Sequence, residues 1–190
     1  MSDNSIQKKD PDKNLVELFE QAKQDNPEAF GRIYTMCFAP VYRYIYLRVG
    51  NKAEAEDLVQ LVFLKAYQRL ANFKHLSSSP LAYLFTIARN AIIDFYRKRK
   101  TVVDNSEDLL SNIPDSRASP PEEYQQNEEI RKVLAAMPAL TADQQEIIIL
   151  KFIEGLENEE LSRITGKSQA AIRQIQSRGL KMLRSLLTKI

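Results

Sequence analysis

One helical stretch, Ala53 to Tyr67 (AEAEDLVQLVFLKAY), constrains the fold of this chain more than any other feature. Its apolar residues recur at steps of three and four, the spacing that places side chains on one face of a helix. This core-facing stripe consists of Ala55, Leu58, Val59, Val62, Phe63, Ala66, Tyr67 and Leu70. The opposite face carries Asp57, Gln60, Leu61 and Leu64, and leucines beside polar groups are typical of a protein-binding surface. Periodicity also allows an ordinary core helix with an apolar outer face.

Helical periodicity continues through most of the chain and predicts an all-α fold. The expected helices cover residues 14–23, 26–49, 53–71, 80–98, 128–137, 141–155 and 158–164, with a last one from 168 onward. Asn26, Thr141 and Ser168 are expected N-caps, and Gln144 completes a capping box with Thr141. Pro40 is expected to bend or break the second helix.

Composition divides the chain into two small helical domains joined by a flexible acidic linker. Residues 1–100 carry 16 basic and 11 acidic side chains, residues 101–129 carry 1 and 8, and residues 130–190 carry 10 and 6. Two basic blocks suggest two units that each meet a polyanion, although ordinary charge fluctuation explains the pattern too. Ser, Asn, Asp and Pro are frequent in the linker. We therefore expect a disordered N-terminus at 1–13, a domain at 14–100, the linker at 101–127 and a second domain at 128–190.

Several function classes are disfavoured by the residues present. A single cysteine, Cys37, and a single histidine, His75, offer neither an internal disulfide nor a metal cluster. We find no phosphate-binding glycine loop and no nucleophile paired with a base, so we expect no enzyme activity and no cofactor. No run is long enough to span a membrane, and the polar N-terminus does not match a signal peptide, so a soluble cytoplasmic protein is expected.

The helix expected at 80–98 combines a core stripe with a basic outer side. Tyr83, Arg89, Asn90 and Arg97 lie away from the stripe, and Lys98 begins a basic run at the end of the helix. A basic face with neighbouring aromatics suits phosphate and base contacts. Arg89, Asn90 and Asp94 alternatively form a polar cluster that only fixes helix packing.

The C-terminal part has the pattern of a helix-turn-helix: a short helix, a turn at Thr165-Gly166-Lys167 and a long helix. In this motif the first residues of the second helix reach base edges. The expected DNA-contacting residues are Lys167, Ser168, Gln169, Ala170, Arg173, Gln174, Ser177 and Arg178. Arg reads guanine and Gln reads adenine, whereas Lys167 and Arg178 suit phosphates. Gly179 is expected to loosen the helix. The alternative is a solvated surface helix.

Four segments resemble bacterial sigma factors of the extracytoplasmic-function type. AEDLVQ-x-VF-x-K-x-Y is similar to the helix that binds core RNA polymerase, with Leu61 where the family usually has an acidic residue. Tyr83 to Asp94 is similar to W-L-x-x-I-A-R-N-x-x-x-D, with Tyr83 in place of tryptophan. Residues 150–161 and 171–183 resemble the domain that binds the −35 promoter element.

The resemblance implies a sigma factor that binds core RNA polymerase, recognises the −10 and −35 elements and opens promoter DNA. It implies polymerase contacts at Asp57, Gln60, Leu61 and Leu64. It also implies −10 contacts at Asn72, Phe73, Lys74, His75, Tyr83, Arg89, Asn90, Arg97 and Lys98. An anti-sigma factor is a further implied partner, and no direct membrane insertion is expected.

Two other classes stay open. One is a free-standing helix-turn-helix regulator that binds a palindrome as a dimer, with the Asp57 face as the dimer contact. The other is an adaptor for a signalling partner, which would show no salt-sensitive DNA affinity.

Overall fold

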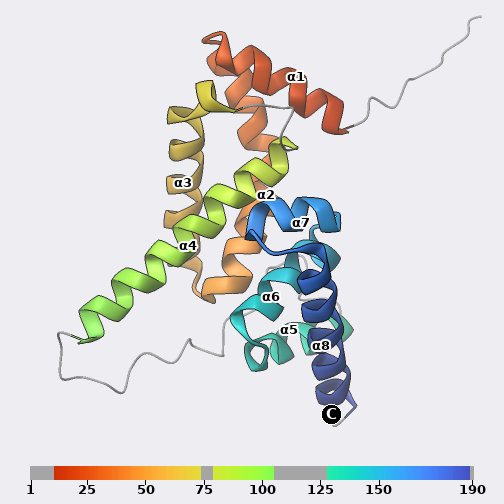
Figure 1. Cartoon of the computed structure of the whole chain (residues 1–190). Coiled ribbons are helices and arrows are strands. Elements are labelled where there is room, and N and C mark those ends of the chain that lie inside the picture. The colour runs from red at the N-terminus through yellow and green to blue at the C-terminus, as the bar shows by residue number, and fades with distance from the viewer. Residues whose placement is uncertain (1–10, 74–78, 105–127, 189–190) are drawn as a thin grey trace, which may run out of the picture.

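The computed structural model describes residues 11–73, 79–104 and 128–188, and the regular elements in these ranges are all helical. Helices α1 to α4 form one unit, here called the N-terminal domain, and α5 to α8 form the C-terminal domain (Figure 1). The elements are α1 (Pro11–Lys23), α2 (Pro27–Val49), α3 (Lys52–Gln68), η1 (Leu70–Asn72), α4 (Pro80–Asp104), α5 (Glu128–Ala136), η4 (Met137–Ala139), α6 (Ala142–Ile148), η5 (Ile149–Ile153), α7 (Asn158–Thr165) and α8 (Gln169–Leu187). The predicted all-α, two-domain fold is confirmed.

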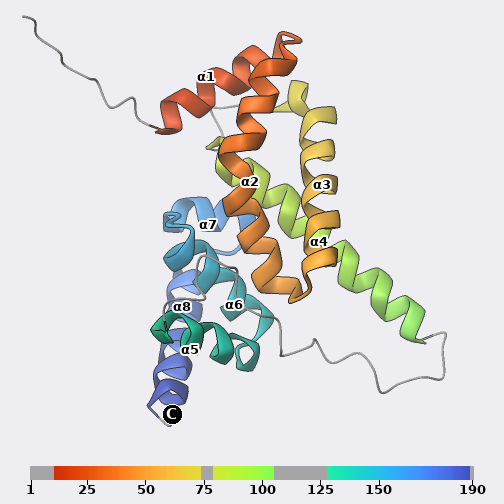
Figure 2. The ribbon, with the colours of Figure 1, turned by 180° about the vertical axis from the view of Figure 1, so that it is seen from behind.

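In the N-terminal domain, α2 and α3 lie side by side and α4 crosses them (Figure 2). The periodic apolar residues form the core between these helices. Ile33, Val59, Leu84 and Phe85 are all inaccessible to solvent. Burying a side chain of this size contributes roughly 1.5–3 kcal/mol, so the three-helix contact is the main stabilising feature of the domain.

Local signals begin and end these helices, and of the two N-caps in this part of the chain the sequence predicted the one at Asn26. The Asn26 and Asn51 side chains accept hydrogen bonds from Ala29 N and Glu54 N, at 3.2 and 3.1 Å. Gly50 ends α2 with φ +72°, a left-handed conformation that glycine adopts without steric cost.

Two expectations for this domain concerned Pro40 and Tyr67. Helix α2 runs through Pro40 without a local break, because Cys37 and Val41 on either side of the proline are buried in the core and their burial outweighs one lost hydrogen bond. The alternative expectation, a bend at Pro40, stays a prediction. Tyr67 was expected in the core stripe but is 52% exposed. Its ring packs edge-on against the Phe30 ring, with 4.9 Å between the two ring centroids. Tyr67 therefore lies at the edge of the domain and not in its core.

In the C-terminal domain, the predicted capping box starts α6. Gln144 N donates to Thr141 Oγ1 at 3.3 Å, and Thr141 N donates to the Gln144 side chain at 3.0 Å. The helix then widens into the π-helical turn η5, where Glu154 N reaches Ile149 O at 3.0 Å. Helix η5 ends at Ile153, and the chain then turns at Gly155, which has φ +75°, before α7 begins at Asn158.

Gly179 is where α8 meets α6. A Cβ atom at this position would lie 2.7 Å from Ile148 Cδ1, closer than side-chain atoms pack. The glycine therefore permits a close crossing of two helices, whereas the sequence alone suggested a loosened helix.

Helices extend beyond the predicted domain limits. Helix α1 begins at Pro11 and α4 continues to Asp104, four residues past the expected limit of the first domain. The prediction of disorder at 1–13 falls mostly outside the described residues, as does most of the predicted linker. The domain boundaries therefore stay predictions.

Candidate functional site

The outward face of α3 brings together the four residues predicted to contact a protein partner. Asp57, Gln60, Leu61 and Leu64 are all exposed, with Leu64 53% accessible. Residues three and four apart lie next to each other on a helix, so these side chains form one continuous patch. Tyr67, one turn beyond Leu64, extends it. An exposed apolar strip beside an acid and an amide is suited to binding another protein.

Phe73, which directly follows η1, belongs to an aromatic cluster. Phe73 is 3% exposed and its ring centroid lies 4.7 Å from Phe19 and 5.1 Å from Tyr83. The Tyr83 hydroxyl donates to Arg69 O at 3.4 Å, and burial raises the pKa of Tyr83, against a smaller opposing effect of Arg69. Lys74, His75 and the side chain of Asn72 lie outside the described residues. The structure therefore gives Phe73 and Tyr83 a packing role beside the predicted −10 region.

The basic residues of α4 point in two directions, some toward solvent and one toward the C-terminal domain. Asn90, Arg97 and Lys98 are exposed, and Arg97 pairs with Asp94 at 3.0 Å. The spacing of seven between Asn90 and Arg97 places them on one stripe of the helix. Arg89, by contrast, is half-buried and its Nε lies 3.2 Å from Glu146 of the C-terminal domain.

Hydrogen bonds in and around the turn fix the two helices of the helix-turn-helix. Gly166 takes φ +71° and its N–H donates to Ser162 O. Ser168 Oγ accepts from Ala171 N at 3.2 Å and so caps α8. Gln176 Nε2 donates to Asn158 Oδ1 at 2.9 Å, which joins the middle of α8 to the start of α7. The first turns of α8 are thereby fixed in direction.

The start of α8 presents the predicted DNA-contacting side chains to solvent. Ser168, Gln169, Ala170, Arg173, Gln174, Ser177 and Arg178 are exposed. Lys167 is half-buried and its Nζ pairs with Asp143 at 2.9 Å. The 19 residues of α8 include four arginines and lysines and no carboxylate. A basic helix of this kind is suited to contact with a phosphate backbone.

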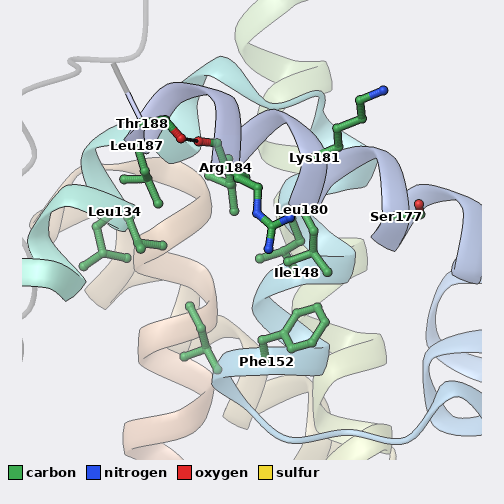
Figure 3. A pocket seen from close by; sticks show the side chains of 12 residues that line it. Leu134, Ile148, Phe152, Ser177, Leu180, Lys181, Arg184, Leu187 and Thr188 are labelled. Carbon is green, nitrogen blue, oxygen red and sulfur yellow. Dashed lines mark hydrogen bonds between the residues drawn. The ribbon is translucent and has the colours of Figure 1, made fainter. Parts of the chain in front are cut away.

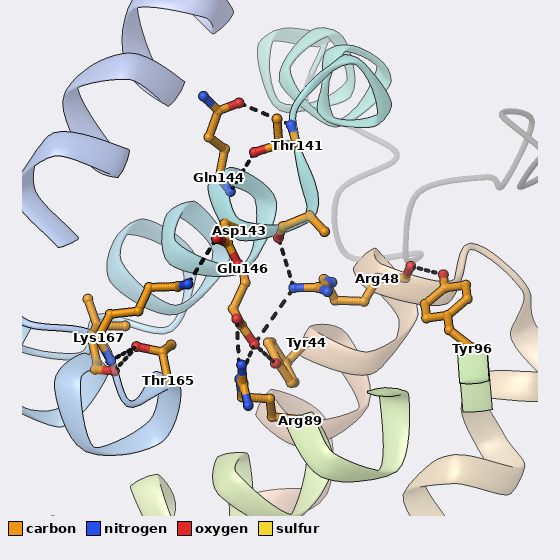
Figure 4. Close-up of polar contacts among 12 residues, drawn as sticks. Tyr44, Arg48, Arg89, Tyr96, Thr141, Asp143, Gln144, Glu146, Thr165 and Lys167 are labelled. Atoms are coloured by element: carbon orange, nitrogen blue, oxygen red, sulfur yellow. Dashed lines mark hydrogen bonds and ion pairs between the residues drawn. The ribbon is translucent and has the colours of Figure 1, made fainter. Parts of the chain in front are cut away.

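Sequence reasoning missed a polar cluster where the two domains meet (Figure 4). Glu146 of α6 is 3% exposed, and the Tyr44 hydroxyl donates to its carboxylate at 2.9 Å. Arg89 Nε lies 3.2 Å and Arg48 Nη1 3.8 Å from the same carboxylate. Burial, and then the Glu146 carboxylate, raise the pKa of Tyr44 well above its ordinary value, so this hydroxyl remains a donor. The sequence held one indication that Glu146 is buried: it lies three and four positions before Ile149 and Leu150, on one face of the helix, and both of these residues are buried.

An open groove of about 1190 Å³ runs between α5, η5 and α8 (Figure 3). Its wall includes Leu134, Ile148, Phe152, Leu180 and Leu187, with Arg184 and Lys181 along the α8 side. Leu180 lines this groove and is therefore 44% exposed.

The remaining chemistry of the described residues is limited. Burial raises the pKa of the Cys37 thiol to about 12, which keeps it protonated. In the ranges that the structure describes, no three His, Cys, Asp or Glu side chains gather in a way that could hold a metal ion. None of the helices in these ranges has the length and apolar character needed to cross a membrane.

Comparison with known protein families assigns both halves of the chain. Residues 33–102 match the model of sigma-70 region 2, and residues 130–183 match that of sigma-70 region 4. The chain is 32% identical over 158 residues to the ECF RNA polymerase sigma factor SigM of Bacillus subtilis, a match that covers 83% of this chain and 94% of SigM.

Two further relatives agree. The ECF RNA polymerase sigma factor BldN of Streptomyces coelicolor is 35% identical over 173 residues, covering 91% of this chain and 66% of BldN. Among solved structures, the sigma factor RpoE in complex with the anti-sigma factor NepR from Bartonella quintana superposes with a TM-score of 0.73. Its sequence identity is 28%, and the match covers 84% of this chain and 96% of RpoE.

Proposed function

The chain belongs to the extracytoplasmic-function RNA polymerase sigma factors, and on this basis we propose which of its surfaces bind polymerase and promoter DNA. The α3 patch of Asp57, Gln60, Leu61 and Leu64 docks on core RNA polymerase. The observation that carries this assignment is the exposure of two leucines one turn apart beside a carboxylate and an amide. A helix face of this kind is costly to leave in water unless a partner covers it.

The DNA contacts follow from the charge and exposure of α4 and α8. Asn90, Arg97 and Lys98 form the track for the −10 element on the exposed stripe of α4. The rings of Phe73 and Tyr83 pack together at the end of η1 and in α4, and Asn72, Lys74 and His75 are further candidate contacts. Arg173 and Gln174 read bases of the −35 element, and Lys167 and Arg178 contact its phosphates.

An anti-sigma factor is a further proposed partner, because the RpoE neighbour was solved with the anti-sigma factor NepR. Sigma factors are in general regulators without catalysis, and in this proposal the chain acts only by binding. Its place of action is the cytoplasm, where the polymerase transcribes.

Co-elution with core RNA polymerase on gel filtration, followed by transcription from a pool of random promoter sequences, tests the proposal. We expect a complex and selective initiation, and the enriched sequences identify both promoter elements. A salt-dependent complex with duplex DNA but none with polymerase would instead identify a free-standing regulator with α3 as its dimer contact.

A further inference from the structure

Lys167 and Asp143 form an ion pair at the turn of the helix-turn-helix. Lys167 Nζ lies 2.9 Å from Asp143 Oδ2, and Asp143 belongs to the first turn of α6 (Figure 4). Lys167 directly precedes Ser168, the N-cap of α8, and is one of the two cations assigned above to promoter phosphates. In the unbound protein an acidic side chain therefore holds a cation of the proposed DNA surface.

The backbone of Lys167 is fixed on both sides. Its carbonyl oxygen accepts a hydrogen bond from Ser162 Oγ at 2.6 Å, and its N–H donates to Thr165 Oγ1 at 3.3 Å. Thr165 is itself buried, and its hydroxyl donates to Leu161 O at 2.7 Å. The main chain is therefore held in place, while the lysine side chain is a flexible stem with a point charge at its end. What that charge meets decides where the side chain points, and here it meets Asp143.

The other basic residues at the start of α8 are not held in this way. Arg173 and Arg178 are exposed, and within the described ranges neither forms an ion pair with a carboxylate. The Lys167–Asp143 pair is partly accessible to solvent, with 26% of the lysine side chain and 52% of the aspartate side chain exposed. Such a pair adds little to stability, so a second anion can displace the carboxylate from the lysine. A DNA phosphate is an anion of this kind.

Asp143 has a second possible role in its own helix. A carboxylate in the first turn of a helix complements the helix dipole, and this effect needs no lysine. Thr141 and Gln144 already start α6 through their capping box. The two roles are separable by measurement, because a change in helix stability leaves the salt dependence of DNA binding unaltered, whereas release of a cation onto a phosphate increases it.

We propose that Asp143 is a specificity-determining residue of the −35 contact, because it competes with DNA phosphate for Lys167. Binding to unrelated DNA is almost entirely electrostatic, so withdrawal of one cation weakens it directly. At a matching site, base contacts hold α8 in one register and keep a phosphate beside the turn, where it displaces Asp143. The carboxylate therefore weakens binding to unrelated DNA more than binding to the −35 element. This role rests on the proposed contact of Lys167 with phosphate.

Asp143→Asn in the 190-residue chain tests the competition. Its binding to a fluorescent duplex of unrelated sequence is measured between about 50 and about 200 mM salt. We expect the slope of log K against log salt to steepen by about 0.9, the effect of one added phosphate contact, which is about 3.5-fold more affinity lost across this range. At the lowest salt the variant should bind at least about threefold more tightly than wild type. The gain on a duplex that carries the selected −35 element should be smaller.

Two further variants separate release of the lysine from a general change of charge. Lys167→Gln removes the cation, and adding Asp143→Asn to it should leave the slope unchanged. Glu157→Gln removes the same charge from a pair of equal length, in which Lys151 Nζ lies 2.9 Å from Glu157 Oε2. Lys151 belongs to η5 and has no assigned DNA contact, so this control should keep the wild-type slope. Thermal unfolding followed by circular dichroism shows that each variant is folded.

An unchanged slope in folded Asp143→Asn, or a gain that persists in the Lys167→Gln background, overturns the competition. Weaker binding by Asp143→Asn overturns it too, and makes Asp143 a residue that positions Lys167 for its phosphate. Equal gains on the two duplexes overturn the specificity role, and no DNA binding by either wild type or variant overturns both. If the slope steepens as expected but no selected sequence supports initiation with polymerase, the proposed sigma function fails while the competition for Lys167 stands.

Discussion

Arg43 and Glu154 are 111 positions apart in the chain, yet their side chains form a two-point ion pair with N–O distances of 2.7 Å. The Glu154 side chain is almost fully covered. Parallel N–H···O contacts of this kind fix orientation as well as distance. The pair therefore defines how η5 and α2 face each other, and with them the two domains.

If the α3 patch binds core polymerase, the substitution Asp57→Arg should weaken that binding. Because Asp57 is exposed, the variant should fold normally, while the Kd for core polymerase should rise at least about 30-fold, the scale of an interface hot spot near 2 kcal/mol. Binding is measured by fluorescence anisotropy with the label on this protein, whose rotation slows when it binds the much larger polymerase. Glu20→Arg on α1 makes the same charge change outside the patch and should bind normally. Wild-type affinity of the Asp57 variant would exclude the patch as the docking surface.

We expect two arginines at the start of α8 to contribute to DNA binding in different ways, one through a base and one through a phosphate. Arg173→Ala should cost about 1–3 kcal/mol and relax specificity at one base position. Arg178→Ala should weaken binding about equally on all sequences and reduce the salt slope by about one. Binding to a panel of single-base variants at several salt concentrations separates them. A uniform loss for Arg173→Ala would show that this side chain touches only phosphate.

Phe73 is expected to matter first for stability. Its ring is buried against Phe19 and Tyr83, so Phe73→Ala should lower the free energy of unfolding by about 3–5 kcal/mol. Urea denaturation followed by circular dichroism measures this loss. Phe73→Leu, which keeps most of the volume, should lose much less. A stable Phe73→Ala protein that fails only in promoter opening would instead favour a direct contact with DNA.

Tyr44→Phe tests the buried hydroxyl at Glu146. Removing the donor leaves a buried carboxylate short of one partner, so unfolding free energy should fall by about 1–3 kcal/mol at neutral pH. The pKa of Tyr44 is raised above 10.0 in the folded protein. Its contribution is therefore complete below pH 10 and is lost as pH rises through the folded value. The difference between wild type and Tyr44→Phe should shrink above pH 10, and a difference that grows there would contradict this assignment.

Gly179 is expected to tolerate no branched side chain. Gly179→Val should destabilise the protein by about 1–3 kcal/mol because the new atoms meet Ile148. Ser185→Val, at an exposed position of the same helix, controls for the helix propensity of valine. Equal stability of the two variants would show that α8 can move away from α6 without cost.

The sequence by itself determined the local structure and the family. Helix ends at Asn26, Gly50, Thr141 and Ser168 were predictable, because a cap is an interaction between residues three or four apart. The stripes of α3 and α4, the turn at Gly166 and the exposed residues at the start of α8 follow from the same short-range periodicity.

Only the tertiary structure decided which polar residues meet over long separations. The partners of Glu146 and Glu154 lie between 57 and 111 positions away in the chain, and nothing in local spacing indicates them. The burial of Phe73, the exposure of Tyr67 and Leu180, and the close contact at Gly179 likewise depend on neighbouring helices. Helical period places a side chain on a face, but burial depends on what packs against that face, and this is a property of the whole fold.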